Sequence, residues 1–239
     1  MNHKALSHPG ECFFTSRRVC RILAALLVLC VVVGMTGCQR SSTDPPVESI
    51  VFAIDENDLG PRYSNAELGV EFRPPVNWLM LPPDQKEAIS QGLLETEVRG
   101  PYTLSIQDVF LNTDSLSFAV ISLVEAADQP STSGSESGTS RASESDLQLS
   151  EYRDYLLESL TQKAAAQEGE VSVDLIRFQV NGLVIDQFRH LVADRAATTL
   201  LFTDKHQDII QLDYSIPVSA FELEIGKLES SIGTLAILQ

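Results

Sequence analysis

Apolar and polar residues alternate along several short segments of this chain, the pattern of strands buried on one face. Val70 and Phe72 alternate with charged residues, and the segments 103–111 and 117–124 are rich in β-branched and aromatic residues. Such runs, bounded by turn-forming residues, predict strands. Residues 84–96 mix apolar and charged positions after two prolines, which predicts a short helix.

Two later segments repeat apolar residues every three or four positions, the spacing of one helix face. In the first, Ser150 is expected to cap a helix that ends near Gly169, and Glu151, Arg153 and Asp154 are expected to face solvent. Its apolar stripe is Tyr152, Tyr155, Leu156 and Leu160. The second helix follows Pro217, and its stripe is Phe221, Ile225, Leu228, Ile232 and Leu235.

Between these helices, four segments have strand character, and turn-forming residues separate them. They are 171–180, 183–192, 198–203 and 209–216. Asn181-Gly182 is a typical two-residue hairpin turn, so an antiparallel meander is predicted. The last strand alternates apolar with polar residues, so its second face is expected to be wetter. The element order predicts an α+β fold: a central antiparallel sheet covered by helices, in one domain over residues 47–239.

Residues 126–146 interrupt the pattern. Nine of these 21 residues are Ser or Thr, glycine recurs at Gly134 and Gly138, and no aromatic residue occurs. This composition predicts a disordered loop. A linker between two domains is the alternative, but the flanking parts look like pieces of one sheet, so we expect an inserted loop.

The start of the chain has the layout of a secretory signal. Arg17, Arg18 and Arg21 precede an uncharged apolar run over residues 22–33, and small residues then lead to Gly37-Cys38. This predicts a lipoprotein signal peptide over residues 1–37, cleaved before a lipidated Cys38. An uncleaved membrane span is disfavoured because it needs about 20 apolar residues. A twin-arginine export signal around Arg17-Arg18 stays a further alternative.

Lipidation of Cys38 would place the domain on a membrane surface. Two or more acyl chains give stable anchoring, and residues 38–46, which contain Pro45-Pro46, are expected to be a flexible tether. The expected location is the cell envelope, on the extracytoplasmic side. If the source has two membranes, Gln39 in place of an aspartate favours the outer membrane, facing the periplasm.

The mature part is strongly acidic. Removing residues 1–37 takes away four basic residues and one acidic residue from totals of 17 and 33, which leaves 13 Lys and Arg against 32 Asp and Glu. Such a surface repels phosphate backbones, so no nucleic-acid partner is expected. Cys38 is its one cysteine, so the fold must be stable without an internal disulfide.

The chain resembles the PsbP-like superfamily, which includes the Ran-binding Mog proteins and bacterial lipoproteins of the DcrB type. The residues that carry the resemblance are Leu68-Gly69-Val70-Glu71-Phe72-Arg73-Pro74, Val76-Asn77-Trp78, the Tyr152 helix, Asn181-Gly182, Phe188, Phe202 and Ile216-Pro217. The resemblance implies an antiparallel sheet covered by helices, and a mostly non-enzymatic role in binding proteins or stabilising assemblies. It brings no catalytic residues and no specific partner.

Few residues suggest site chemistry. His190 is predicted to be a hydrogen-bonded strand residue and His206 an exposed turn residue, with metal binding as the alternative for each. Residues 55–60 resemble a calcium loop, but Leu59 stands where an EF-hand needs an oxygen ligand. Trp78 is predicted to anchor the core, with a ligand platform as the alternative. We therefore expect no catalytic, cofactor-binding or metal-binding residue.

These observations favour a non-enzymatic envelope lipoprotein that presents its domain to an unidentified protein partner or assembly. The alternative is a carrier of a small apolar or lipid ligand, and a hydrolase that uses scattered carboxylates is a third hypothesis. An exposed apolar patch would favour the first function. A large internal apolar pocket would favour the second.

Overall fold

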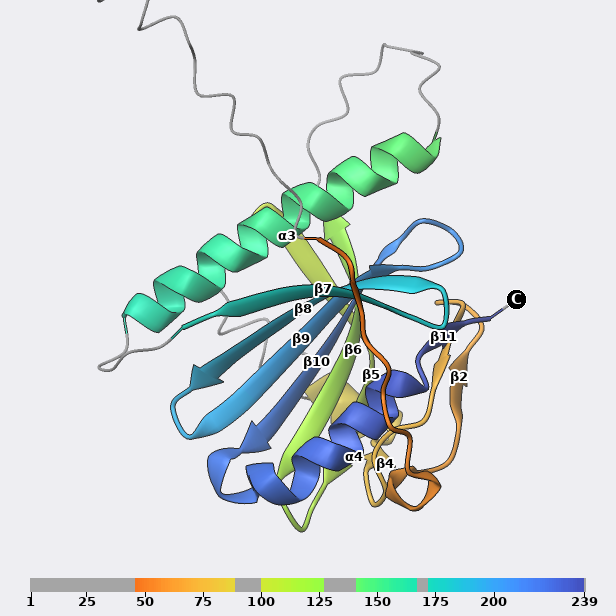
Figure 1. The fold of residues 1–239 in the computed structure, drawn as a ribbon, viewed down its shortest axis with the longest axis vertical. Coiled ribbons are helices and arrows are strands. Elements are labelled where there is room, and N and C mark those ends of the chain that lie inside the picture. The colour runs from red at the N-terminus through yellow and green to blue at the C-terminus, as the bar shows by residue number, and fades with distance from the viewer. Residues whose placement is uncertain (1–45, 89–99, 127–140, 167–171, 239) are drawn as a thin grey trace, which may run out of the picture. The chain divides into compact units, whose positions relative to one another are not determined.

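The computed structural model describes residues 46–88, 100–126, 141–166 and 172–238, with the backbone alone for 141–145 (Figure 1). All of them belong to one compact unit, Pro45–Gln239. The predicted signal peptide, Cys38 and most of the predicted Ser/Thr-rich loop lie outside the described residues. In the described parts of the chain, no helix has the length and apolarity that a membrane span needs.

The main element is an eight-stranded sheet in the order β1-β7-β8-β9-β10-β6-β5-β4 (Figure 1). Its strands are β1 (Glu48–Ser49), β4 (Leu79–Met80), β5 (Tyr102–Asn112), β6 (Ser117–Ala126), β7 (Asp174–Val180), β8 (Leu183–Val192), β9 (Arg195–Thr203) and β10 (Ile209–Pro217). Only the short β1–β7 pair is parallel among the described pairs of this sheet. The predicted meander is confirmed, and positive φ angles at Asn181 and Gly182 form its first turn.

A smaller sheet, in the order β11-β3-β2, lies beside the C-terminal helix α4 (Phe221–Gly233). Its strands are β2 (Tyr63–Asn65), β3 (Val70–Phe72) and β11 (Ala236–Ile237). Two short 3-10 helices, η1 (Glu56–Asp58) and η2 (Val218–Ala220), complete this side. Residues 83–88 are helical, as predicted for the start of the 84–96 segment, and residues 89–96 lie outside the described residues.

Helix α4 covers one face of the large sheet. Its stripe residues Leu228 and Ile232 are buried in a cluster with sheet residues such as Phe178, Leu200 and Tyr214. The predicted stripe is confirmed up to Ile232, whereas Leu235 is buried but follows the end of the helix. Trp78 belongs to the same cluster, and its Nε1 donates a hydrogen bond to Glu224 Oε2 at 3.1 Å. Trp78 is therefore a core anchor, as predicted.

Helix α3 (Arg141–Ala165) packs on the opposite face, where Tyr152 and Leu160 cluster with Phe188 and Leu201. It begins before Ser150, so residues 141–146 are helical, and the loop prediction is wrong for them and for Ala126 in β6. Ser150 is not a cap, because its Oγ accepts a hydrogen bond from Arg153 Nη2 at 2.9 Å.

Side chains on the second face of β10 are more buried than predicted, because α3 covers this face. Gln211 is buried, its Oε1 accepts a hydrogen bond from the Tyr152 hydroxyl, and its Nε2 donates to Asp213 Oδ2 at 2.7 Å. The Thr199 hydroxyl donates to Asp213 Oδ1 at 2.5 Å. These bonds satisfy polar groups that would otherwise be costly to bury.

The prediction that Arg153 faces solvent is wrong, because it points toward a carboxylate of the sheet. Arg153 is 2% exposed and Asp186 is 1% exposed, and Arg153 Nη1 lies 3.9 Å from Asp186 Oδ2. Arg177 on β7 donates two hydrogen bonds to the same carboxylate, from Nε to Oδ1 at 2.7 Å and from Nη2 to Oδ2 at 2.8 Å. Bidentate Arg–carboxylate pairs are among the strongest hydrogen-bonded contacts, so Asp186 ties α3 to two strands.

Replacing Asp186 by Asn should lower the free energy of unfolding by about 3–5 kcal/mol, because it removes a buried carboxylate that pairs with Arg177 and faces Arg153. Urea unfolding followed by the fluorescence of Trp78, the single tryptophan, measures this change. The matched control is Asp154→Asn, which also removes a carboxylate beside Arg153 but one that is 61% exposed. Its cost should stay below about 1 kcal/mol, and equal losses in the two variants would contradict the role of Asp186.

Candidate functional site

The structure does not bring the two histidines together. His190 lies near the end of β8, opposite Ala197 at the start of β9, whereas His206 follows the far end of β9. His206 is exposed in the turn, as predicted, and its backbone N–H donates to Asp204 Oδ1 at 2.7 Å. The His190 Nδ1 atom is buried without a hydrogen-bond partner, so the prediction of a hydrogen-bonded histidine is wrong for this nitrogen.

The acidic segment 55–60 forms the turn around η1. The Asp55 carboxylate accepts hydrogen bonds from the backbone and side-chain nitrogens of Asn57, at 2.9 and 3.0 Å. Glu56 forms an ion pair with Arg73. These carboxylates therefore serve a turn and an ion pair, and the described residues contain no group of three or more His, Cys, Asp and Glu that could hold a metal.

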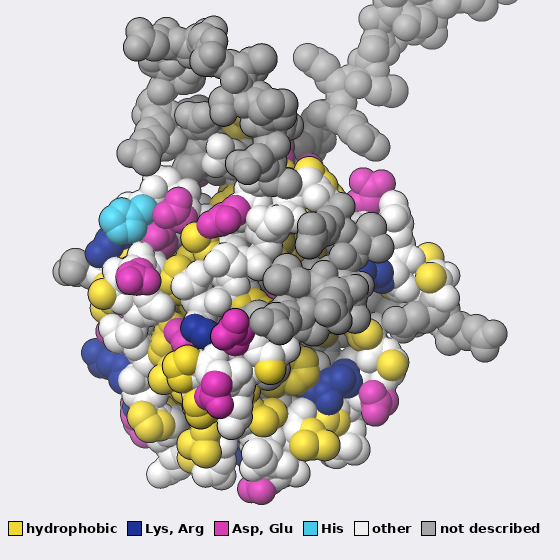
Figure 2. Space-filling view, turned by 180° about the vertical axis from the view of Figure 1, so that it is seen from behind, with side chains coloured by type: hydrophobic (Ala, Val, Ile, Leu, Met, Phe, Trp, Pro, Cys, Tyr) yellow, Lys and Arg dark blue, Asp and Glu magenta, His cyan; other side chains and the backbone are white. Residues whose placement is uncertain are grey.

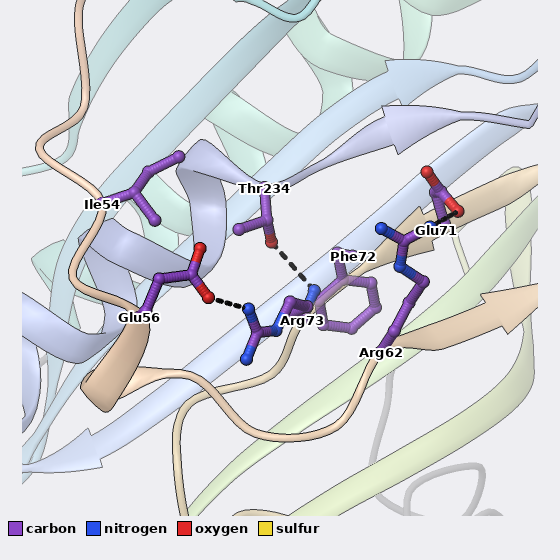
Figure 3. A pocket seen from close by; sticks show the side chains of 7 residues that line it. All are labelled: Ile54, Glu56, Arg62, Glu71, Phe72, Arg73 and Thr234. Atoms are coloured by element: carbon purple, nitrogen blue, oxygen red, sulfur yellow. Dashed lines mark hydrogen bonds and ion pairs between the residues drawn. The ribbon is translucent and has the colours of Figure 1, made fainter.

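Arg73 is also the centre of a shallow polar cavity of about 180 Å³ (Figure 3). Figure 3 shows Arg62 facing Glu71 and Arg73 facing Glu56, so each cation on this wall has its own carboxylate. The backbone N–H of Arg73 donates to Thr234 Oγ1 at 2.8 Å, and its carbonyl accepts from Ser231 Oγ at 2.7 Å. These contacts join η1 and β3 to the end of α4, so we interpret the cavity as a structural joint.

A second cavity, of about 260 Å³, lies between α3 and the end of β8. Its lining residues are Leu160, Lys163, Ala164, Ala166, His190, Leu191 and Val192. Burial lowers the pKa of the His190 imidazole below its ordinary value of 6.5, and the charge of Lys163 lowers it further. The cavity therefore joins apolar walls to one ammonium group and one neutral imidazole.

Large apolar side chains are exposed at the end of the molecule where β4, the β5–β6 hairpin and the start of α4 lie, the lower end in Figure 1. Five of them, each 52–70% exposed, define what we call the apolar end: Leu79, Met80, Leu116, Val218 and Leu223. Figure 2 shows hydrophobic side chains gathered toward the same end. Exposed apolar side chains that gather at one end of a domain are a typical feature of an interaction site.

Polar contacts link the elements that carry the apolar end. The hydrogen bond from Trp78 to Glu224 ties the segment before β4 to α4. Arg195 binds the Leu116 carbonyl through Nη2 at 2.7 Å and Ser215 Oγ through Nε at 2.7 Å. Its guanidinium also lies 5.0 Å from the centre of the Phe118 ring. The exposed side chains thus project from a fixed frame.

Strand register extends the apolar surface across the sheet. Leu79 lies opposite Leu111, which lies opposite Phe118, and directly opposed residues share a face. Leu116 adds a further observation, because its φ of 58° is a conformation that favours Gly, Asn or Asp. A strained residue is a reason to suspect function, and here the strain accompanies an exposed leucine.

Sequence reasoning missed the apolar end. The five residues come from four separate segments, and none belongs to a periodic stripe. The available signals were Leu79-Met80 directly after the buried Trp78, Leu116 within a polar hairpin turn, and Leu223 off the buried face of α4. Each signal is weak alone, because single exposed apolar residues are common on protein surfaces.

No protein-family model matches the chain, and no curated protein is similar to it. Among solved structures, the chain is similar to the cyanobacterial PsbP (CyanoP) from Synechocystis sp. PCC 6803. The two sequences are 16% identical, the TM-score is 0.40, and the match covers 79% of this chain and 98% of the CyanoP chain. It is also similar to the Saccharomyces cerevisiae Ran-binding protein Mog1p. These sequences are 9% identical, the TM-score is 0.38, and the match covers 75% of this chain and 95% of the Mog1p chain. These two proteins are a PsbP and a Ran-binding Mog protein, two of the groups that the sequence resemblance names.

His190 should make stability depend on pH. The folded state resists protonation of His190, so its pKa is lower there than in the unfolded state. Below about pH 6.5 the unfolded state therefore binds more protons than the folded state. As a result, the free energy of unfolding falls as the pH decreases from about 6.5 toward the pKa of the folded state. The slope from this one group is at most about 1.4 kcal/mol per pH unit. Urea unfolding over a pH series should show a smaller loss for His190→Asn than for the parent protein. The exposed-residue control His206→Asn should keep the parent's slope; equal slopes in all three proteins would contradict the prediction.

Proposed function

We propose that this protein is a lipoprotein of the cell envelope, anchored to a membrane through Cys38, that uses its α+β domain to bind a protein partner without catalysing a reaction. The anchor rests on the basic cluster, the apolar run and Gly37-Cys38 in the sequence. The binding role rests on the apolar end. A mature chain with a large net negative charge favours a protein over a nucleic acid as the partner.

The apolar end is the observation that carries the binding role. Its residues remain exposed although the domain has two well-packed apolar clusters. Exposing large apolar side chains forgoes about 1.5–3 kcal/mol for each one that could be buried. A partner that covers them would recover this stabilisation, and Met80 adds a flexible side chain of the kind that adapts to binding surfaces.

The sizes of the cavities favour protein binding at the apolar end over a carrier role in which a whole lipid is enclosed. Pockets that enclose a drug-sized ligand span about 300–1,000 Å³, whereas the two cavities described above are about 180 and 260 Å³. The polar one is lined by ion pairs, and the apolar one lies beside the last turns of α3. A carrier that encloses a whole lipid would need more enclosed volume than either provides.

A photoreactive amino acid at Met80 should crosslink the full-length protein, in cells, to one reproducible protein. The same probe at Val184 is the matched control, because Val184 is also an exposed apolar residue but lies beside the β7–β8 turn. When the probe is at position 80, the further substitution Leu79→Ser or Leu223→Ser should lower the crosslinked yield about tenfold, which is the effect of losing a central apolar contact. Crosslinks that form equally from Val184, or that survive both substitutions, would contradict the role of the apolar end.

Leu116→Asn separates binding from stability. Asparagine tolerates a positive φ better than leucine, so this variant should unfold at the same or a higher urea concentration than the parent. Its crosslinked yield from Met80 should nevertheless fall, because an apolar contact is lost. Yield and stability that fall together would indicate a structural role for Leu116.

Replacing Cys38 by Ala should abolish metabolic labelling with a radioactive fatty acid, and should shift the protein from the detergent phase to the aqueous phase of a phase partition. The physical reason is that each buried acyl methylene contributes about 0.8 kcal/mol to membrane affinity. The matched control is Cys30→Ala, which lies within the expected signal peptide and should leave labelling of the mature protein unchanged. Labelling that persists in Cys38→Ala would refute the anchor.

A further inference from the structure

The cavity between α3 and β8 has a different chemistry from the apolar end and from the polar joint. Leu160 and Ala164 from α3 form one wall, and Leu191 and Val192 from β8 contribute to the other. Leu160 and Ala164 are buried, whereas Leu191 and Val192 are partly exposed. Apolar side chains therefore line a space that opens to solvent.

Two nitrogen-bearing side chains belong to the same lining. Lys163 is exposed, and among the described residues no ion pair joins it to a carboxylate. The His190 Nδ1 atom is buried and has no hydrogen-bond partner. Lys205 is also exposed without an ion pair among the described residues, so what distinguishes Lys163 is its position on an apolar cavity.

The proximity of these two groups is supported by their electrostatic coupling. The Lys163 charge contributes to lowering the pKa of His190, after the larger effect of burial, and no carboxylate contributes. A neutral imidazole still has one N–H that can donate a hydrogen bond. The cavity thus offers an ammonium and a hydrogen-bond donor beside apolar walls.

We propose that this cavity binds a medium-chain fatty acid in its ionised form. The carboxylate lies at the ammonium group of Lys163, which is exposed, and beside the His190 imidazole, which lines the same cavity. The acyl chain lies against Leu160, Ala164 and Leu191, away from water. This site is independent of the apolar end and of the proposed protein partner.

Chain length gives the proposal a quantitative signature. Burial of each methylene is favourable by a constant increment, so two further methylenes should raise the affinity roughly tenfold. The cavity volume of about 260 Å³ limits this gain, because methylenes beyond the cavity stay in water. Affinity should therefore rise from butanoate through hexanoate to octanoate and then level off.

The test is a titration of the full domain, residues 38–239, with sodium octanoate, measured by calorimetry and by the NMR signals of the His190 ring protons. Octanoate should bind and shift these signals, and octanol and octylamine should bind more weakly because they lack the carboxylate. Lys163→Gln should lower octanoate affinity about two- to fivefold, the contribution of a solvent-exposed ion pair. Ala164→Leu should largely abolish binding, because the added methyl groups occupy the cavity.

The matched control is Lys205→Gln, which removes an exposed lysine from the β9–β10 turn and should leave the affinity unchanged. Because Lys163 is exposed, its substitution tests the site even if Ala164→Leu unfolds the domain. Octanoate affinity unaffected by Lys163→Gln, or equalled by octanol, would overturn the proposal. Vesicles of phosphatidylglycerol serve as a final comparison, and binding to them through Lys163 without binding of octanoate would assign the site to a lipid surface and also overturn it.

Discussion

A carboxylate buried between a helix and the sheet determines how the layers of this domain meet. Both carboxylate oxygens of Asp186 accept hydrogen bonds from Arg177 of the neighbouring strand, and Arg153 of α3 forms an ion pair with the same carboxylate. A buried charge is tolerated only when its partners are in place. The contact between Arg153 and Asp186 therefore favours the position of helix α3 that brings these two side chains together.

The two faces of the sheet are stabilised in different ways. Beneath α4 the contacts are apolar and aromatic, and the one buried carboxylate, Glu224, binds Trp78 and Lys227. Beneath α3, apolar contacts are interrupted by Asp186 and by the chain of bonds through Tyr152, Gln211 and Asp213. Such polar networks depend on geometry more strictly than apolar contacts do. The α4 face supplies most of the apolar burial, and the α3 face fixes the orientation of its helix.

This division of roles leaves two surfaces that the core does not use. The apolar end projects from β4, the β5–β6 hairpin and α4, and the bonds of Trp78 and Arg195 hold its frame rigid. The fatty-acid cavity forms where the last turns of α3 pass over the end of β8. Both lie at the margins of the packed layers, where side chains keep an apolar environment and remain accessible from solvent.

The sequence by itself determined the fold class, the antiparallel meander, both apolar helix stripes and the burial of Trp78. These features follow from local periodicity and turn chemistry, which act between residues close in the chain. Local reasoning failed for Arg153 and Gln211, because a polar residue on a strand or helix is assigned to solvent unless its partner is known. Those partners, Asp186 and Tyr152, are distant in sequence, and only the tertiary structure brings them close. The apolar end and the cavity were decided in the same way: each gathers residues from segments far apart in the chain, and their shared surface exists only once the helices lie on the sheet.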